Sequence, residues 1–160
     1  WVRGYAPVGH TPVLNVISER FGLTMVSAVS NQGRVCFEFL EGAANTRSTL
    51  DFMQKLVADN AGQKVFLIMD NLKVHHAKDV TAWAQAHTRE IELFYLPPYT
   101  PQLNPDEHLN RDFKTALRSV SGCSTRTGLL AQAQEFMQSL VNMPERVKSY
   151  FRHGEVVFAA

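Results

Sequence analysis

The sequence has little that would suggest a membrane, secreted or thiolate-metal protein. Its 160 residues include two cysteines, Cys36 and Cys123, whose separation fits no metal-binding spacing, so we expect both thiols to stay reduced. No hydrophobic run approaches the ~20 residues that a membrane-spanning helix needs, and no basic and then apolar leader opens the chain. These absences predict a cytoplasmic protein that does not contact membranes.

The chain also lacks an excess of charge of either sign. The formal net charge is +1, so bulk charge alone does not indicate a nucleic-acid-binding protein. Hydrophobic residues make up 45% of the chain, which is enough for one domain with its own core. We therefore expect a single domain over residues 1–160, and any binding surface has to come from a local arrangement of side chains.

The central part of the chain predicts a pair of parallel strands. An apolar run, Val65–Met69, ends at Asp70, and its composition is typical of a strand buried on both faces. A second apolar run covers residues 91–96, and a helical pattern covers residues 78–87 between the two. A crossover this short favours parallel strands. Asp70 is then expected at the carboxyl edge of the sheet, where open α/β sheets carry their active sites.

The remaining pattern predicts a mixed sheet flanked by helices. We expect a hairpin of strands at 23–30 and 34–40, a possible edge strand at 11–17, and helices at about 46–60, 106–119, 125–142 and 144–151. This order gives the sheet an antiparallel side and a parallel side. The predicted fold class is α/β.

A second acidic residue is expected near Asp70. Asn104 is a good N-cap and Pro105 suits the first helical position, so Glu107 falls in the first turn of a helix that begins just beyond the second strand. Carboxylates from different elements that meet at one edge suit Mg²⁺, and a pair of such ions supports phosphoryl chemistry. Asp70 and Glu107 are therefore the candidate catalytic and metal-binding residues.

Cationic side chains accompany both acids. The candidate DNA-binding residues are Lys73, His75, Arg111, Lys114 and Arg118. The last three follow Glu107 at helical spacing, so they share one helix face that suits a phosphate backbone.

Structural alternatives exist for each of these residues. An aspartate after a buried strand often only forms a turn or caps a helix. Glu107 stands three residues after Asn104, which is the spacing of a capping box. The cationic stripe is also compatible with an ordinary solvated helix face.

Three motifs resemble one known family. They are Asp70-Asn71 followed by His75, the run Leu-Pro-Pro-Tyr-Thr-Pro at 96–101, and the run Leu-Asn-Pro-Asp-Glu-His at 103–108 followed by Lys114. Together they resemble the DDE-type transposases of bacterial insertion sequences related to mariner-like elements. The segment 1–12, with its Trp, Gly and Pro spacing, is similar to an early motif of the same family.

The resemblance implies a fold and an activity. It implies a ribonuclease-H-like fold, as in retroviral integrases, and cleavage and strand transfer of transposon DNA with Mg²⁺ or Mn²⁺, two ions in the complete enzyme, by a homodimer. By position, Asp70 corresponds to the second catalytic aspartate and Glu107 to the terminal acid, with 36 residues between them and Asp106 as an alternative ligand. Asn110 stands where the family usually has Trp, and Thr100 where it often has Ser.

One departure from the family affects the chemistry. The family's first aspartate and its helix-turn-helix modules lie upstream of the segment that starts this chain, and Glu19, Glu38 and Glu41 are poor substitutes for that aspartate. We therefore expect a catalytic domain without its first strand, inactive in isolation, in which residues 11–17 or a partner chain fill the gap. Two alternatives remain: another Mg²⁺-dependent nuclease of the same fold, or a non-catalytic remnant that binds DNA or dimerises.

Overall fold

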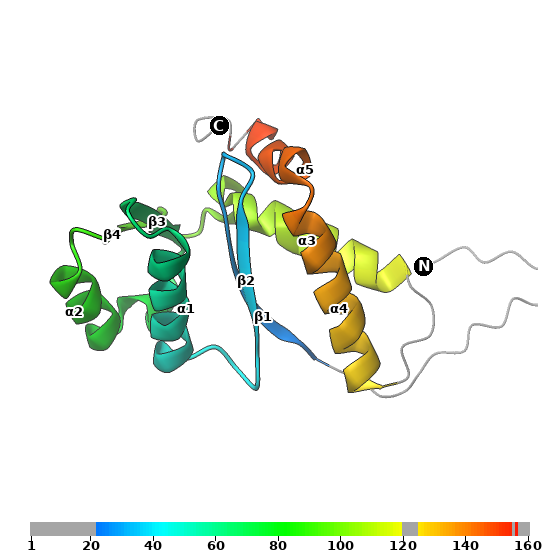
Figure 1. Ribbon diagram of the computed structural model, residues 1–160, viewed down its shortest axis with the longest axis horizontal. Coiled ribbons are helices and arrows are strands. Elements are labelled where there is room, and N and C mark those ends of the chain that lie inside the picture. Colours follow the sequence, from blue (N-terminus) through cyan, green and yellow to red (C-terminus); the bar gives the residue numbers. More distant parts are fainter. Residues whose placement is uncertain (1–21, 120–124, 155, 157–160) are drawn as a thin grey trace, which may run out of the picture.

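The computed structural model describes residues 22–119, 125–154 and 156 (Figure 1). Its elements are β1 (Thr24–Val29), β2 (Val35–Leu40), α1 (Thr46–Asp59), β3 (Val65–Met69), the 3-10 helix η1 (Lys73–His76), α2 (Lys78–Ala86), β4 (Ile91–Tyr95), η2 (Pro101–Leu103), α3 (Pro105–Ser119), α4 (Arg126–Val141), α5 (Pro144–Ser149) and η3 (Tyr150–Arg152). The segment 1–12, the predicted strand at 11–17 and Cys123 lie outside the described residues.

The predicted hairpin is confirmed. Strands β1 and β2 pair antiparallel, with Thr24 opposite Leu40 and Val29 opposite Val35. The turn between them needs a glycine at position 33, where φ is +89° and a Cβ atom would lie 2.7 Å from the carbonyl oxygen of Pro144. The hairpin turn and the start of α5 are therefore in close backbone contact.

The predicted parallel pair is confirmed as well. Strands β3 and β4 run parallel in register from Val65 opposite Ile91 to Met69 opposite Tyr95, and α2 forms the crossover. The antiparallel and parallel sides expected of a mixed sheet are thus both present. Within the described residues they form two separate two-stranded sheets with no ladder between them.

The prediction that β3 is buried on both faces is wrong. Phe66 and Ile68 are 63% and 55% exposed, and Phe94 on β4 is 44% exposed on the same face. Helices α1 and α2 cover only the opposite face, where they enclose one apolar cluster: Met53, Val80, Ala84 and Ile91, with Val65, Leu67 and Leu93 packed against them. An apolar run in the sequence indicates a strand, but the number of covering layers depends on the rest of the fold.

A second apolar cluster joins the hairpin to the C-terminal helices. Its buried members come from α3, α4, α5 and the residues after α5: Leu109, Phe113, Ala133, Met137, Leu140, Val147, Tyr150, Phe151 and Val156. The side chains of Val35, Phe37 and Phe39 pack against it from β2, as their alternation in the sequence predicts.

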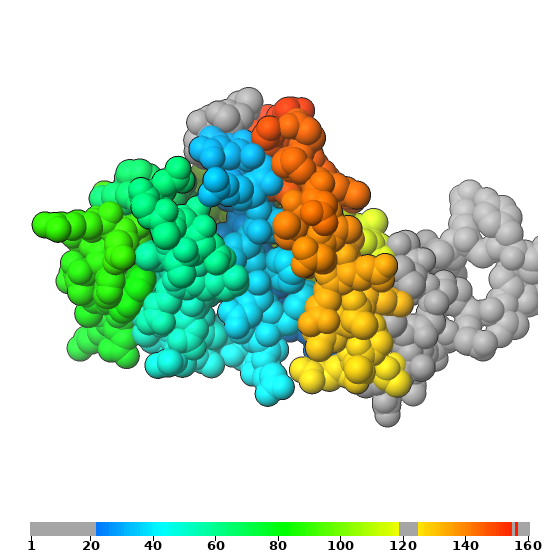
Figure 2. All heavy atoms as spheres, in the orientation of Figure 1, coloured from blue at the N-terminus to red at the C-terminus, as the bar shows by residue number. Residues whose placement is uncertain are grey.

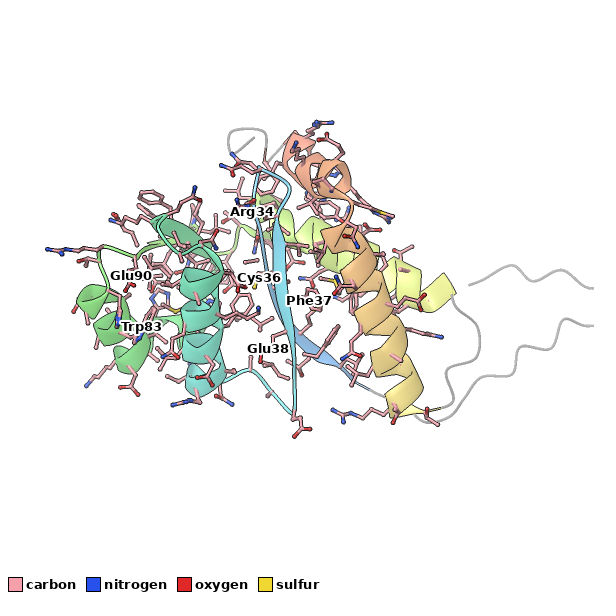
Figure 3. The ribbon with its side chains drawn as sticks, in the orientation of Figure 1. Arg34, Cys36, Phe37, Glu38, Trp83 and Glu90 are labelled. Carbon is pink, nitrogen blue, oxygen red and sulfur yellow. The ribbon has the colours of Figure 1, made fainter. Side chains whose placement is uncertain are left out.

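The hairpin lies between the two clusters. Figure 3 shows Phe37 on the α4 side of β2 and Cys36 on the α1 side, and Figure 2 shows the hairpin atoms between those of α1 and α4. Cys36 is a half-buried free thiol whose Sγ donates to Oδ2 of Asp59 at 3.7 Å. Arg34 Nη1 donates to Oδ1 of Asn60 at 2.9 Å, which also ties β2 to the end of α1.

The helix boundaries follow caps that the sequence carries. The side chain of Asn45 accepts a hydrogen bond from the backbone N–H of Ser48, and the Ser48 hydroxyl accepts one from the backbone N–H of Asn45. Helix α1 therefore begins with a capping box. Thr125 caps α4 by accepting from the backbone N–H of Gly128 at 3.1 Å. No helix in the described part of the chain has the length and apolarity to cross a bilayer.

Candidate active site

Asp70 follows the last residue of β3 and forms a turn. Its Oδ1 accepts a hydrogen bond from the backbone N–H of Leu72 at 3.1 Å, and Nδ1 of His75 lies 2.9 Å from the same oxygen. The structural alternative for Asp70, a turn former, is therefore partly right. Its Oδ2 makes no hydrogen bond or ion pair with the described residues, so one carboxylate oxygen is left for other partners.

A set of side-chain bonds fixes η1 against the end of β4. The Asn71 side-chain amide donates to the carbonyl oxygen of Leu96, and its Oδ1 lies 3.1 Å from Nε2 of His76. The imidazole of His76 stacks on Tyr95 with 4.3 Å between ring centroids, and the Tyr95 hydroxyl donates to the carbonyl oxygen of His75 at 3.0 Å. The backbone around Asp70 is thereby held to the neighbouring parallel strand.

Glu107 lies in the first turn of α3 and does not serve as a cap. The side chain of Asn104 accepts from the backbone N–H of Asp106 at 3.0 Å, which starts the helix. The backbone N–H of Asn104, which a capping box would pair with Glu107, donates instead to the carbonyl oxygen of Pro101 at 3.0 Å. The capping-box interpretation is therefore wrong. The Glu107 carboxylate is exposed and has no hydrogen bond or ion pair within the described part of the chain.

Asp70 and Glu107 line the same pocket, of about 430 Å³. The other lining residues come from the loop after β3 and from the loop between β4 and α3, among them Asn71, Leu96, Tyr99 and Asn104. The structure thus brings together the two acids that the sequence predicts at one edge. They lie at the carboxyl end of β3 and in the first turn of α3.

Asp106, the alternative ligand, faces strand β1. The Ser27 hydroxyl donates to Oδ1 of Asp106 at 2.8 Å, and the Asn110 side chain donates to Oδ2 at 3.4 Å. Burial raises the pKa of Asp106 to about 6; the Ser27 hydrogen bond lowers the pKa, and the charges of Glu107 and Asp70 raise it. The negative charges of Glu107 and Asp70 therefore act on Asp106, and a cation bound near them would offset these charges.

The candidate cationic residues are mostly available to solvent. Arg111, Lys114 and Arg118 are exposed on α3, Lys73 is exposed on η1, and none of the four forms an ion pair with a described residue. His75 differs, because it is half-buried and contacts Asp70. The arrangement leaves four cations free to contact an anionic partner.

The carboxylates of Asp70 and Glu107 are oxygen donors available to a divalent ion in this pocket. Among the described residues, no group of three or more His, Cys, Asp or Glu side chains is placed to hold a metal. Asp70 and Glu107 nevertheless offer oxygen donors from two elements to one pocket. Mg²⁺ is commonly held by one or two carboxylates, with waters and substrate phosphates as its other ligands, so the pair fits such an ion.

Residues 1–127 match the family described as DDE superfamily endonuclease. The chain belongs to this family. The match includes every motif on which the resemblance depends, from the first twelve residues to Lys114, so the resemblance is confirmed. No curated protein matches the chain.

The DDE domain is also similar to solved structures. A structure of the Mos1 transposase catalytic domain with raltegravir and Mg aligns with a TM-score of 0.58 at 14% identity, over 86% of this chain and 76% of that one. The catalytic domain of the Mos1 mariner transposase aligns with a TM-score of 0.57 at 16% identity, over 86% and 79%. A Mos1 mariner paired end complex with Mn aligns with a TM-score of 0.54 at 19% identity, over 98% and 50%. These likenesses give the domain the ribonuclease-H-like fold that the family resemblance implies.

Several residues around the DDE pocket are not predicted by sequence reasoning. The hydrogen bond from Ser27 to Asp106 joins segments 79 residues apart and has no local signal. The stacking of His76 on Tyr95 likewise depends on the parallel register. Tyr99 does carry a signal, because prolines at 97, 98 and 101 surround it and indicate an irregular, rigid loop.

Proposed function

We propose that this DDE domain is the catalytic core of a transposase, which cleaves DNA strands at transposon ends and joins them to target DNA. The observation that carries the proposal is the pocket shared by Asp70 and Glu107 in a chain of the DDE endonuclease family. In this proposal both acids are catalytic and hold Mg²⁺ or Mn²⁺, with two ions in the complete enzyme. The Mg and Mn of the similar Mos1 structures support this choice of metal.

The chain's own residues prepare the site for a cation and a phosphate. The bound metal would polarise a phosphoryl oxygen and lower the pKa of a bound water. Asp70 is held through Oδ1 by Leu72 and His75, so its orientation is set before any ligand arrives. Glu107 is unpaired and free to move toward a ligand. A cation bound there would offset the negative charges that Asp70 and Glu107 bring to one pocket.

The exposed cations are proposed as DNA-binding residues. Lys73 belongs to the turn after Asp70, and Arg111, Lys114 and Arg118 belong to the helix that starts with Glu107. A DNA backbone with one phosphate in the pocket would have its neighbouring phosphates within reach of charges on the turn after Asp70 and along α3. His75 is proposed as an additional donor that also orients Asp70. We expect a cytoplasmic location, where this DNA is accessible.

We further propose that residues 1–160 form one catalytic domain that acts as a homodimer. The hairpin that lies between the two apolar clusters supports a single domain. Transposition processes two transposon ends, so two catalytic domains are expected to act together. The family's first aspartate has no counterpart among the described acids that line the pocket. We therefore expect the 160-residue chain alone to be inactive or nearly so.

Cleavage assays test this proposal. The longest natural reading frame that contains the chain is incubated with Mg²⁺ and either transposon-end DNA or an RNA–DNA hybrid. We expect nicking of the transposon-end DNA, and Asp70→Asn or Glu107→Gln should reduce it by ~10³-fold or more, in line with loss of a metal ligand. Preferential cleavage of the hybrid would favour another nuclease of the same fold. Nicking by the 160-residue chain alone would contradict its expected inactivity.

A second candidate is a non-catalytic protein that binds DNA. It is favoured by the lack of a three-acid cluster in the described part of the chain and by the unpaired cations of α3. It predicts salt-sensitive DNA binding that survives loss of Asp70 and Glu107 but fails when Arg111 and Lys114 are both replaced. Absence of cleavage by the longest reading frame, together with this binding pattern, would select it.

A further inference from the structure

Tyr99 has an unusual backbone and an unusually exposed ring. Its φ angle is +59°, and it is the one non-glycine residue of the described chain with a positive φ. Its side chain is 99% exposed. A left-handed backbone is costly for a bulky residue, and such a cost is usually offset by packing of the side chain. Here the ring packs against nothing within the described residues.

The loop around Tyr99 holds this conformation without help from the ring. The Thr100 hydroxyl donates to the carbonyl oxygen of Pro97 at 2.6 Å, and the backbone N–H of Leu103 donates to the carbonyl oxygen of Thr100 at 3.0 Å. On the other side, the backbone N–H of Leu96 bonds to the carbonyl oxygen of Met69 at 2.8 Å. Hydrogen bonds therefore fix the loop on both sides of Tyr99, while the ring is exposed to solvent.

Tyr99 is among the residues that line the pocket of Asp70 and Glu107. A DNA strand with a phosphate in this pocket would bring the adjacent bases to the wall of the pocket. Every base offers a flat face that an aromatic ring can stack on, but in a duplex that face is covered by neighbouring bases. A fully exposed ring at this place therefore suits a base that has left the stack.

We propose that Tyr99 is a stacking platform for an unpaired base of the DNA strand that enters the pocket of Asp70 and Glu107. The inference rests on the proposed function, because that function supplies the DNA strand. It adds a specificity: the site prefers strand ends or overhangs with unpaired bases to fully paired duplex. The proposal requires only the aromatic ring, so the Tyr99 hydroxyl, which has no hydrogen bond within the described residues, is expected to be dispensable.

Three variants separate stacking from folding. Tyr99→Phe keeps the ring, whereas Tyr99→Asn removes the ring and keeps a residue that tolerates positive φ. Phe66→Asn removes another exposed ring, 63% exposed on β3 and absent from the pocket lining, and serves as the matched control. The melting temperature of Tyr99→Asn should equal or exceed that of the wild-type chain, because Asn relieves the backbone cost.

The experiment measures binding of the 160-residue chain to two DNAs. One is a blunt duplex and the other carries a single-stranded overhang with 2-aminopurine as its first unpaired base. We expect the wild-type chain, Tyr99→Phe and Phe66→Asn to quench the 2-aminopurine and to bind the overhang alike. Tyr99→Asn should lose the quenching and bind the overhang about tenfold more weakly, with unchanged binding to the blunt duplex.

The outcomes distinguish this inference from the proposed function. Equal overhang binding and equal quenching by Tyr99→Asn and the wild-type chain would overturn the stacking role while leaving the DNA-cleaving assignment intact. Equal weakening by Phe66→Asn would also overturn it, since the effect would then be nonspecific. Failure of the wild-type chain to bind the overhang would also overturn the stacking role, whereas the proposed function is tested separately by the cleavage assay on the longest reading frame. The salt dependence of binding should be the same for Tyr99→Asn and the wild-type chain, because stacking releases no counterions.

Discussion

Ser27 Oγ donates a 2.8 Å hydrogen bond to Oδ1 of Asp106 and so joins strand β1 to the first turn of helix α3. Asp106 is adjacent to Glu107, and β1 belongs to the hairpin that packs on α3 and α4. The bond therefore fixes the position of the helix turn that carries Glu107. It also holds the half-buried Asp106 carboxyl group against β1.

Asp106 should make the stability of the domain depend on pH. Burial raises its pKa from 3.8 to about 6 in the folded chain. The folded state then binds the proton more tightly than the unfolded state, so this carboxyl group favours folding most below pH 3.8 and loses that contribution as pH rises to above 6. The Asp106→Asn variant has no carboxyl group at this position to titrate. Its free energy of unfolding in urea, relative to that of the wild-type chain, should therefore increase as pH rises from 3.8 to about 6. A difference in free energy of unfolding that does not change with pH would contradict the raised pKa of Asp106.

Asp112 should show the opposite dependence. Burial alone would raise its pKa, but hydrogen bonds from Arg146 and Tyr150 outweigh this and lower the pKa. Arg146 Nε and Nη2 lie 2.8 and 2.7 Å from its oxygens, and the Tyr150 hydroxyl lies 2.5 Å away. We expect Asp112→Asn to cost about 1–3 kcal/mol at neutral pH.

The pH profile provides the control for Asp112. Its pKa is depressed in the folded chain, so the stabilisation is present above the unfolded pKa of 3.8 and is lost as pH falls through the lower folded value. The difference in free energy of unfolding between the wild-type chain and Asp112→Asn, measured with urea, should therefore decrease as pH falls. An unchanged difference would show that the network contributes packing rather than charge.

The two faces of the β3–β4 sheet should respond differently to substitution. Ile91 is 1% exposed beneath α1 and α2, so Ile91→Ala should destabilise the fold by about 2–5 kcal/mol. Phe66 is 63% exposed on the other face, and Phe66→Lys should change stability by less than about 1 kcal/mol. Chemical denaturation measures both. A large loss for Phe66→Lys would mean that this face is covered in solution.

The exposed cations of α3 should determine how DNA binding depends on salt. Each phosphate contact contributes about 0.9 to the slope of log affinity against log salt concentration. Arg111→Gln and Lys114→Gln should each reduce the slope by about that amount. Lys55→Gln is the matched control, because Lys55 is already paired with Asp59 at 2.9 Å on α1. A slope equally reduced by Lys55→Gln would indicate a nonspecific charge effect.

The sequence predicts most elements because their signals are local. The hairpin alternation, the Asn45 cap, the Asn104-Pro105 helix start and the β3–α2–β4 unit are all encoded within a few residues of where they act. The convergence of Asp70 and Glu107 could also be anticipated, because parallel strands end at one edge and α3 begins just beyond the end of β4. The motifs themselves identify the family that the matched residues 1–127 establish.

Features that depend on distant packing were not predictable in the same way. The exposure of Phe66 and Ile68 depends on which layers cover β3, and the bond between Ser27 and Asp106 depends on how the hairpin meets α3. The capping-box spacing at Glu107 was a misleading local signal, because η2 supplies a carbonyl oxygen to the same backbone N–H. The ring exposure of Tyr99 also follows only from the folded loop.

The central claim is that Asp70 and Glu107 hold one divalent ion between them. Mn²⁺ binding to the 160-residue chain, followed by electron paramagnetic resonance, tests it directly and requires no catalysis. We expect Asp70→Asn and Glu107→Gln each to weaken binding by about tenfold or more, with little further loss in the double variant. Asp79→Asn, an exposed acid in the first turn of α2, should have no effect. Undiminished Mn²⁺ binding in the double variant would contradict the account.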